Sequence, residues 1–304
     1  VPAMAEPGTG EARRASGLHP ALAELLGLLE LERIEADLFR GRNERSRLPR
    51  VFGGQVLAQG LRAAALTAPE RAPHSLHAYF LRPGDREQPI LFEVERIRDG
   101  RSFATRRVRA IQAGEPIFAL SASFQVRETG FEHQTAARPV PGPETLEDDT
   151  AVARRLAGTD PNVMPWQTHE RAFESRSVYP VGTPQPEAPI KPAWYRARSP
   201  LPETGVDALH ECLLAYVSDM GLMSTSLVPH ASDTPRSRVV GASLDHAIWF
   251  HRPLRVDRWV LYDRDSPTAA SARGFNRGAF FAEDGTLLAS TAQESLIRVR
   301  RDGA

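Results

Sequence analysis

An approximate internal repeat constrains this chain more than any other feature of its sequence. Three landmarks of the first half recur in the second half at a nearly constant offset, 250 − 80 = 170 or 277 − 106 = 171 residues. They are Phe80-Leu-Arg-Pro83 with Phe250-His-Arg-Pro253, Arg106 with Arg277, and Gly114 with Gly285. Because a helical segment precedes several strand-like segments in both halves, we interpret the chain as an internal duplication.

The first half is predicted to be one central helix followed by an antiparallel sheet. The helix covers residues 52–66, is rich in small residues and is opened by Gly53-Gly54, which lets other backbone approach closely. Its polar side carries Gln55, Gln59 and Arg62, and the ordinary interpretation is a solvated face, which we prefer for Arg62 more than for the glutamines. Alternating segments separated by short turn signals predict an α+β layer, with strands over residues 75–81, 90–97, 102–112 and 116–126.

The rest of the chain can be divided by composition. Residues 1–17 are expected to be a disordered lead, and residues 18–127 the N-terminal repeat, which starts with a helix over 19–31 and a strand-like stretch over 31–40. Residues 128–200 are Pro-rich and weakly periodic, which predicts a linker with a short helix near 150–157. Residues 201–304 form the C-terminal repeat, with a helix over 207–220 and strands over 243–250, 258–263, 269–282 and 286–298.

Asp219 is the unusual residue of the second helix. Apolar residues of this segment gather on one helical face, and Asp219 lies on the rim of that stripe beside Cys212 and Ala215. A carboxylate held against apolar packing is costly unless partners stabilise it, so it is either tied into hydrogen bonds or kept for chemistry. Later strands offer hydroxyl and amide partners, but spacing alone cannot choose among them.

Composition excludes several classes of partner and site. The 38 basic and 38 acidic residues balance, so no global field recommends a nucleic acid or an acidic membrane. A single cysteine rules out an internal disulfide and favours a reducing compartment, and we expect a cytoplasmic protein without a cofactor or membrane insertion. No apolar run of spanning length and no secretory signal is evident in the sequence.

Local motifs for other chemistries are weak or missing. Gly241-Ala-Ser-Leu-Asp245 lacks the second glycine of a nucleophile elbow, and no phosphate-binding loop is present. A metal site built from Asp245, His246 and His251 is disfavoured, because the two histidines would face opposite sides of one strand. We expect structural or substrate-lining histidines, and Cys212 in the core.

Several longer motifs closely resemble the acyl-CoA thioesterase II (TesB-like) family. The resemblance runs in order from about Leu31 to Arg298, through both halves. The motifs are Val51-Phe-Gly-Gly-Gln-Val56, His74-Ser-Leu-His-Ala-Tyr-Phe-Leu-Arg-Pro-Gly-Asp85, Gly130-Phe-Glu-His133, Asp245-His-Ala-Ile-Trp-Phe-His-Arg-Pro253 and Ser271-Ala-Arg-Gly274. The family implies a double hotdog fold, in which each of two repeats wraps an antiparallel sheet around a long helix.

The resemblance also implies a reaction and its residues. The family hydrolyses fatty acyl-CoA to free fatty acid and CoA, using a water activated by an Asp, Thr and Gln set. These positions fall on Asp219, Ser243 and Gln293, so the family threonine is a serine here, which keeps the hydroxyl and loses a methyl group. Gly53-Gly54 at a helix N-terminus is a candidate donor to the thioester oxygen. One catalytic centre per chain is expected, because the first helix lacks a carboxylate.

Two other functions stay open at this point. A hotdog enoyl-CoA hydratase would pair Asp219 with a histidine, His210 or His246, and a non-enzymatic acyl-CoA-binding module would hold the thioester intact. Exposed sheet edges and the resemblance favour a homo-oligomer. Five arginines are candidates either for CoA phosphates or for covering sheet edges: Arg82, Arg106, Arg252, Arg273 and Arg277.

Overall fold

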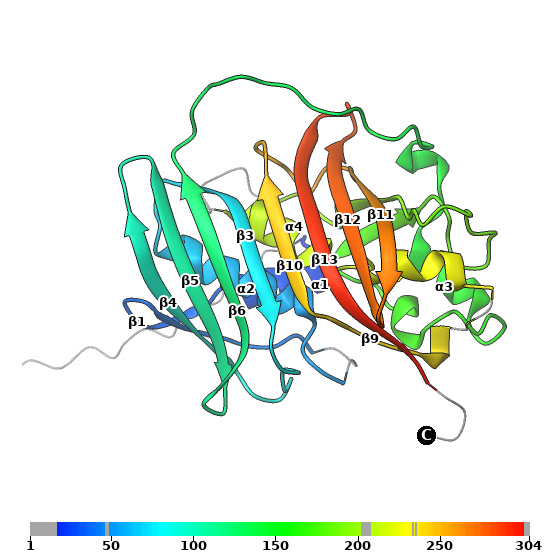
Figure 1. Cartoon of the computed structure of the whole chain (residues 1–304), viewed down its shortest axis with the longest axis horizontal. Coiled ribbons are helices and arrows are strands. Elements are labelled where there is room, and N and C mark those ends of the chain that lie inside the picture. The colour runs from blue at the N-terminus through cyan, green and yellow to red at the C-terminus, as the bar shows by residue number, and fades with distance from the viewer. Residues whose placement is uncertain (1–16, 46–48, 202–207, 233, 235, 301–304) are drawn as a thin grey trace, which may run out of the picture.

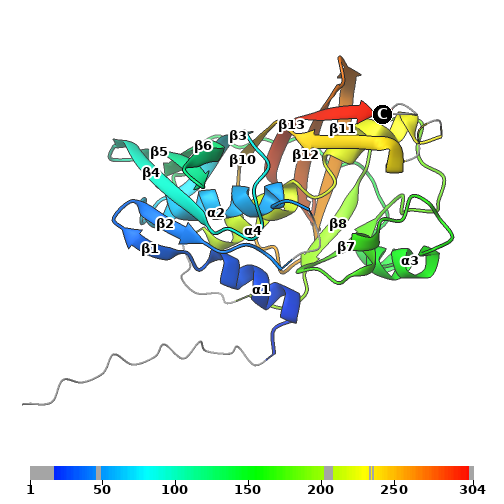
Figure 2. The same ribbon diagram turned by 90° about the horizontal axis from the view of Figure 1, so that it is seen from below.

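The strands of the two halves join into one antiparallel sheet. The computed structural model describes residues 17–45, 49–201, 208–232, 234 and 236–300. Across the sheet the order is β1-β2-β4-β5-β6-β3-β10-β13-β12-β11-β8-β7, with β9 paired to β13 (Figure 1 and Figure 2). The central part is therefore symmetric, with β4-β5-β6-β3 from the first repeat on one side and β10-β13-β12-β11 from the second repeat on the other. This α+β arrangement of two repeats is the predicted double hotdog.

The elements of the N-terminal repeat follow the predicted order. They are α1 (Pro20–Leu29), β1 (Glu32–Glu35), β2 (Leu38–Gly41), α2 (Gly53–Leu66), β3 (Ala72–Phe80), β4 (Ile90–Asp99), β5 (Phe103–Gln112) and β6 (Glu115–Gln125). The stretch over 31–40, which alternates like one strand, is a hairpin of two antiparallel strands. The predicted lead falls almost entirely outside the described residues.

The C-terminal repeat is built around α4 (Leu209–Ser218). Its strands are β9 (Val239–Ser243), β10 (Asp245–Phe250), β11 (Val260–Ala270), β12 (Arg273–Ala282) and β13 (Leu287–Val299). Short 3-10 helices η3 (Met223–His230) and η4 (Arg236–Arg238) lie between α4 and β9. The predicted strand over 243–250 is thus split, because β9 and β10 both pair with β13 but along different parts of it.

Residues 128–200, expected as a linker, contribute to the sheet as well. The predicted short helix is α3 (Asp149–Leu156), and η1 (Pro143–Thr145) and η2 (Pro165–Thr168) flank it. Two further strands, β7 (Phe173–Ser177) and β8 (Ala193–Ala197), pair with each other, and β8 extends the sheet by pairing with β11. The segment therefore joins the halves and also widens the second one.

The register at the centre of the sheet defines a pseudo-twofold axis. β3 and β10 pair antiparallel, and His77 lies opposite Ala247. Since 77 + 170 = 247, each of these residues is opposite its own counterpart in the repeat. The same alignment gives Leu76 as the counterpart of His246, and both are buried.

Neighbouring strands extend this alignment and correct one sequence match. Ala122 pairs with Arg106 in the first repeat, and Gln293 pairs with Asn276 in the second. Arg106 is 1% exposed and Asn276 is fully buried, whereas Arg277 is exposed on the other face. The counterpart of Arg106 is therefore Asn276, because a shift of one residue moves a strand side chain to the opposite face.

Helices α2 and α4 lie side by side under one face of the sheet (Figure 2). Gly54 permits their close approach, because a Cβ atom at this position would lie only 2.4 Å from the Tyr216 carbonyl oxygen. The beginning of α2 therefore meets the end of α4. This contact brings the first repeat to Asp219.

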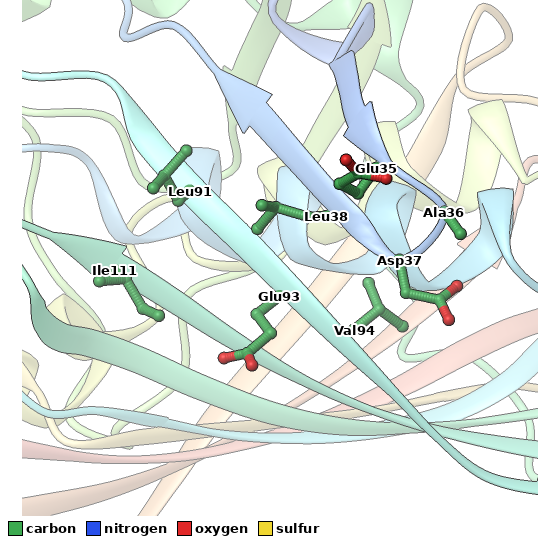
Figure 3. Close-up of a pocket in the computed structure, with 8 residues that line it drawn as sticks. All are labelled: Glu35, Ala36, Asp37, Leu38, Leu91, Glu93, Val94 and Ile111. Atoms are coloured by element: carbon green, nitrogen blue, oxygen red, sulfur yellow. The ribbon is translucent and has the colours of Figure 1, made fainter.

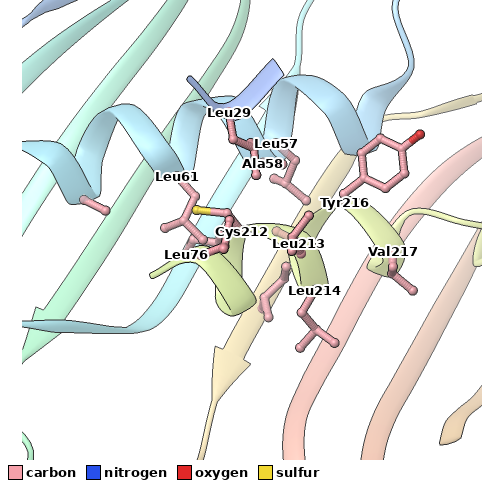
Figure 4. Close-up of a cluster of buried hydrophobic side chains, with 14 of the residues drawn as sticks. Leu29, Leu57, Ala58, Leu61, Leu76, Cys212, Leu213, Leu214, Tyr216 and Val217 are labelled. Carbon is pink, nitrogen blue, oxygen red and sulfur yellow. The ribbon is translucent and has the colours of Figure 1, made fainter. Parts of the chain in front are cut away.

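The hydrophobic core lies between these helices and the sheet. Leu57 and Leu61 of α2 and Leu213 of α4 are fully buried, and Cys212 lies among them as expected (Figure 4). Burial of this apolar surface is the main stabilising contribution to the fold. Cys212 is thus a core residue, and burial raises the pKa of its thiol.

The two glutamines on the polar side of α2 are buried, whereas Arg62, for which we prefer a solvated position, is half-buried. Gln55 and Gln59 are 2% and 0% exposed. Gln59 Nε2 donates to the carbonyl oxygens of Leu28 and Arg42, and Gln55 Nε2 donates to Asn43. The two amides bind the segment that follows β2, so they satisfy buried backbone groups instead of meeting water.

Contrary to the expectation from the sequence, one apolar stretch, Leu209–His230, has the length and hydropathy of a membrane-spanning helix. In the structure 67% of its most apolar 18-residue window is buried inside the fold. It is also not one continuous α-helix, because α4 ends at Ser218 and Gly221 adopts a φ of 73° before η3. Its first part, α4, is the core helix of the second repeat.

Candidate active site

Asp219 lies at the C-terminal cap of α4, just beyond the last helical residue. Carbonyl oxygens on both sides of it are held by side chains of β11. The Tyr262 hydroxyl donates to the Ser218 carbonyl at 2.8 Å, and Arg264 Nη1 donates to the Met220 carbonyl at 3.0 Å. These contacts fix the backbone at the end of α4, so the Asp219 side chain has a defined origin. No sequence motif pointed to Tyr262 or Arg264, because their partners are backbone atoms.

The carboxylate of Asp219 meets both of its predicted partners. Gln293 Nε2 of β13 donates to Asp219 Oδ1 at 2.7 Å, and Ser243 Oγ of β9 donates to the same oxygen at 3.1 Å. The Gly54 N–H at the start of α2 also donates to this carboxylate. Residues from both repeats therefore surround one acid group.

Gly53 leaves the room that this carboxylate occupies. A Cβ atom on Gly53 would lie 2.6 Å from Asp219 Oδ2 and 3.0 Å from the Phe80 ring. Only a residue without a side chain fits there without displacing the carboxylate. The Gly53-Gly54 pair thus has two separate uses, because Gly54 allows α2 to approach α4 and Gly53 makes space for the acid.

The pKa of Asp219 is raised from its ordinary value of 3.8 to about 6. Desolvation by burial is the largest cause, and the hydrogen bonds from Gln293, Ser243 and Gly54 and the charge of Arg50 partly offset it. The position at a helix C-terminus also disfavours an anion. A carboxylate with this pKa is ionised at neutral pH and can still accept a proton readily.

A buried histidine extends the cluster on the side away from Asp219. His246 Nδ1 lies 3.2 Å from Gln293 Nε2, and His246 Nε2 lies 2.9 Å from Ser218 Oγ. Burial lowers the pKa of His246 to about 3, so the imidazole is neutral. The hydratase alternative required a histidine close to Asp219, and His246 approaches only through Gln293. The other candidate, His210, accepts from the Val256 N–H through Nδ1.

The five candidate arginines all form ion pairs within the chain. Arg106 is buried and bonded to Asp99, so it is not available to a ligand at the surface. The other four pair near the sheet surface, Arg82 with Glu115, Arg252 with Glu132, Arg273 with Glu294 and Arg277 with Asp265. These pairs match the sheet-covering alternative and leave the question of CoA phosphates open.

One surface pocket lies away from this cluster. Residues of β1, β2 and β4 and the end of β5 line it at the outer edge of the first repeat, and Figure 3 shows Glu35, Leu38 and Glu93 around it. It contains no group that contacts Asp219. A second pocket, lined by residues that include His19, Arg198 and Asp257, is likewise separate from the acid. The candidate site is therefore defined by its hydrogen bonds.

Comparison with known proteins places both halves in one group. Residues 167–296 match the acyl-CoA thioesterase family, and residues 44–125 match the acyl-CoA thioesterase N-terminal domain. The chain is 42% identical to acyl-CoA thioesterase 2 of Haemophilus influenzae, over 91% of this chain and 98% of that protein. It is 40% identical to human acyl-coenzyme A thioesterase 8, over 90% of this chain and 88% of that protein.

Solved structures agree with these sequence relationships. The crystal structure of the acyl-CoA thioesterase II TesB2 from Mycobacterium marinum matches with a TM-score of 0.76 and 39% identity, over 92% of this chain and 100% of that one. A hotdog-fold protein of unknown function from Alicyclobacillus acidocaldarius matches with a TM-score of 0.73 at 20% identity, covering 91% and 98% of the two chains. The second match supports the fold alone.

Proposed function

This chain belongs to the TesB-like acyl-CoA thioesterase family and is a thioester hydrolase, and from that premise we propose that it hydrolyses fatty acyl-CoA through a water activated by Asp219. The observation that carries the proposal is the convergence of Gln293 and Ser243 on one oxygen of the Asp219 carboxylate, at 2.7 and 3.1 Å. The products are a free fatty acid and CoA. No cofactor takes part in the proposed reaction.

In the proposed reaction Asp219 acts first as a base and then as an acid. The water oxygen forms a bond to the thioester carbonyl carbon while one water proton passes to the Asp219 carboxylate. The tetrahedral intermediate then collapses, the carbon–sulfur bond breaks, and the sulfur leaves as the CoA thiol after receiving the proton from Asp219. The carboxylate is thereby restored, and no covalent enzyme intermediate is needed.

Ser243 and Gln293 position the acid and the water in this proposal. The Ser243 hydroxyl proton is committed to Asp219, so its oxygen lone pairs are the part that can accept from the attacking water. Fixing the water beside the carbonyl carbon lowers the entropic part of the barrier. A serine supplies the same oxygen as the threonine that the family resemblance implies here, with a less restricted side-chain rotamer.

The start of α2 is the proposed source of donors to the developing oxyanion. The Gly54 N–H already donates to Asp219, so the Gly53 N–H is the better candidate of the pair. The N-terminus of a helix stabilises negative charge, and α2 begins at Gly53. Because this donor comes from the first repeat, both repeats would contribute to the reaction.

A panel of acyl-CoA substrates of graded chain length tests the proposal. We expect thiol release by the parent protein, and a decrease of about 10²- to 10⁴-fold in kcat for Asp219→Asn, which removes the base while keeping the side-chain shape. The variant should stay folded and should still bind a non-hydrolysable thioether analogue of the preferred substrate. Unchanged hydrolysis by Asp219→Asn would refute the assignment of the base.

The same proteins separate hydrolysis from the alternatives. Addition of water to an enoyl-CoA without thiol release would favour the hydratase over the proposed reaction. Binding of acyl-CoA with the thioester left intact would point to the binding module. Both outcomes are read directly from the products, since only hydrolysis liberates the free thiol.

A further inference from the structure

His246 contacts Gln293 on the side opposite Asp219. A histidine occurs at this position only in the second repeat, which also carries Asp219. His246 is 1% exposed on β10, and its ring reaches Gln293 on one side and Ser218 on the other. In the first repeat the counterpart of His246 is Leu76, and the counterpart of Gln293 is Ala122. The duplicated framework therefore packs well with apolar residues at both positions, and the polar pair occurs where the acid is.

The hydrogen bonds determine which ring nitrogen of His246 carries the proton. Ser218 Oγ donates its own proton to the Ala215 carbonyl at 2.8 Å, so it can only accept from His246 Nε2. The imidazole is neutral, so with the proton on Nε2 the Nδ1 atom presents a lone pair. That lone pair faces the Gln293 amide.

This lone pair helps to fix the orientation of the Gln293 amide, together with the Ser295 hydroxyl, which donates to Gln293 Oε1 at 3.4 Å. Asp219 Oδ1 and His246 Nδ1 are both acceptors, and the amide nitrogen has two N–H groups, one for each. The reversed amide would place its oxygen against two acceptors. When Asp219 is protonated during the reaction, its new O–H could attract the amide oxygen, and His246 would still oppose that reversal.

From this geometry we propose that His246 is a positioning residue that keeps the N–H groups of Gln293 directed at Asp219 throughout the hydrolytic cycle. The proposal rests on the proposed function, since it assigns a role relative to the Asp219 base. His246 does not contact the water or the substrate in this role. It acts through Gln293, and Ser218 acts one step further by fixing the imidazole tautomer.

The charged and titratable groups around Asp219 do not themselves titrate near its pKa, so the pH dependence of the rate can report on Asp219. Arg50 precedes α2 and donates to the Gly241 carbonyl at 2.8 Å, and its charge favours the Asp219 anion. Tyr262 of β11 interacts electrostatically with Asp219, and burial raises the pKa of its hydroxyl above the working range. His246 of β10 stays neutral there, so the acid limb of the kcat/KM profile reports Asp219.

A pair of substitutions distinguishes positioning from simple packing. His246→Leu installs the side chain of the counterpart position and removes the acceptor, so we expect kcat to fall about tenfold at pH 7 with KM little changed. The acid limb should also move to higher pH by about half a unit to one unit, because the Asp219 anion loses part of its hydrogen bond. His246→Asn places Oδ1 where Nδ1 was, and it should stay within about threefold of the parent with its acid limb unmoved.

Two further variants keep the test decisive if His246→Leu folds poorly. Ser218→Ala removes the acceptor of the Nε2 proton, so it frees the tautomer and should shift the acid limb in the same direction by a smaller amount. Leu76→Asn is the matched control, because it disturbs the equivalent buried position of the first repeat. It should lower the thermal midpoint while the folded protein keeps the parent acid limb.

The outcomes separate this inference from the proposed function. An unmoved acid limb in both His246→Leu and Ser218→Ala would overturn the positioning role, and so would equal losses in His246→Leu and His246→Asn without any shift. Neither result bears on the base, which Asp219→Asn tests alone. A shift in His246→Leu that is restored in His246→Asn supports the inference.

Discussion

The C-terminal caps of α2 and α4 occupy corresponding places in the two repeats but differ in charge and hydrogen bonding. At the C-terminal cap of α2, Thr67 accepts from Arg106 through both its hydroxyl and its carbonyl oxygen, at 2.8 Å each. At the C-terminal cap of α4, Asp219 accepts from the neutral donors Gln293 and Ser243. A cation at a helix C-terminus is electrostatically favourable and an anion there is unfavourable. The first repeat thus closes its helix end with a stabilising contact, and the second keeps a destabilised acid.

This difference shows what each repeat contributes to the site around Asp219. The first repeat could not hold a comparable acid at Thr67 without pairing it to the buried Arg106, which would hold its pKa low and make it a poor base. The second repeat surrounds Asp219 with amide and hydroxyl donors, which leave its pKa at about 6. The first repeat still serves this site by supplying the N-terminus of α2.

The largest expected effect is on stability in the first repeat. Arg106→Met removes a buried guanidinium that bonds Thr67, Asp99 and two further backbone carbonyls. Several buried acceptors lose their donor, so we expect the free energy of unfolding to fall by roughly 2–4 kcal/mol. Urea denaturation measures the loss. The kcat of the folded fraction should stay within about threefold of the parent, and a large kcat defect would mean that the two helix ends are coupled.

Asp219→Asn should have the opposite sign of effect on stability. The pKa of Asp219 is raised from 3.8 to about 6 in the folded protein, so the folded state binds a proton more readily than the unfolded state. Stability from this group is therefore present below pH 4 and is lost as the pH rises through about 6. Replacing the anion should raise the free energy of unfolding at pH 7 by roughly 2–3 kcal/mol, the equivalent of this pKa shift.

Denaturant titrations at several pH values test this sign. The difference between parent and Asp219→Asn should shrink below pH 4, where the parent carboxyl is protonated in both states. A clear decrease in stability of Asp219→Asn at pH 7 would contradict the interpretation of Asp219 as a strained acid. Arg106→Met should keep its full stability deficit down to about pH 4 and lose part of it only below that, as Asp99, whose pKa Arg106 lowers, becomes protonated.

Substitutions of Ser243 should have a smaller effect, and two of them distinguish the contribution of the hydroxyl from that of side-chain volume. Ser243→Ala removes the hydroxyl on Asp219 Oδ1, and we expect kcat to fall about 10- to 30-fold. Ser243→Thr retains the oxygen and adds a methyl group, so kcat should remain within about threefold of the parent. Thiol-release kinetics with the preferred acyl-CoA measure both variants. Equal losses in the two would show that space, and not the hydroxyl, matters at this position.

The smallest expected effect is on the pH dependence of kcat/KM, compared between the parent protein and variants at the C-terminal end of α2. Because the base must be ionised, kcat/KM should rise with pH through a midpoint near the Asp219 pKa of about 6 and then level off. Variants of Thr67 or Arg106 should leave this midpoint in place, since they act at the other helix end. A midpoint near the ordinary aspartate value would mean that substrate or water changes the environment of Asp219.

Much of the fold followed from local pattern. Turn signals and alternation located strands β3 to β6 to within a few residues, and the repeat predicted a second copy of the same order. Strands β7 and β8 escaped notice because they lie in Pro-rich sequence and are stabilised by pairing with β11, which is distant in the chain. The arginine match failed for a related reason, since the two repeats differ by one residue in places and only strand pairing shows which face a side chain occupies.

The sequence by itself determined that Asp219 is an unusual acid, and the family motifs named Ser243 and Gln293 as its partners. Only the tertiary structure decided that all three meet, because they come from α4, β9 and β13 and the Gly54 N–H is added from the other repeat. It also decided the pKa of Asp219 and the place of His246, since burial and hydrogen-bond geometry depend on residues far apart in the chain. Local propensity carries no record of such contacts.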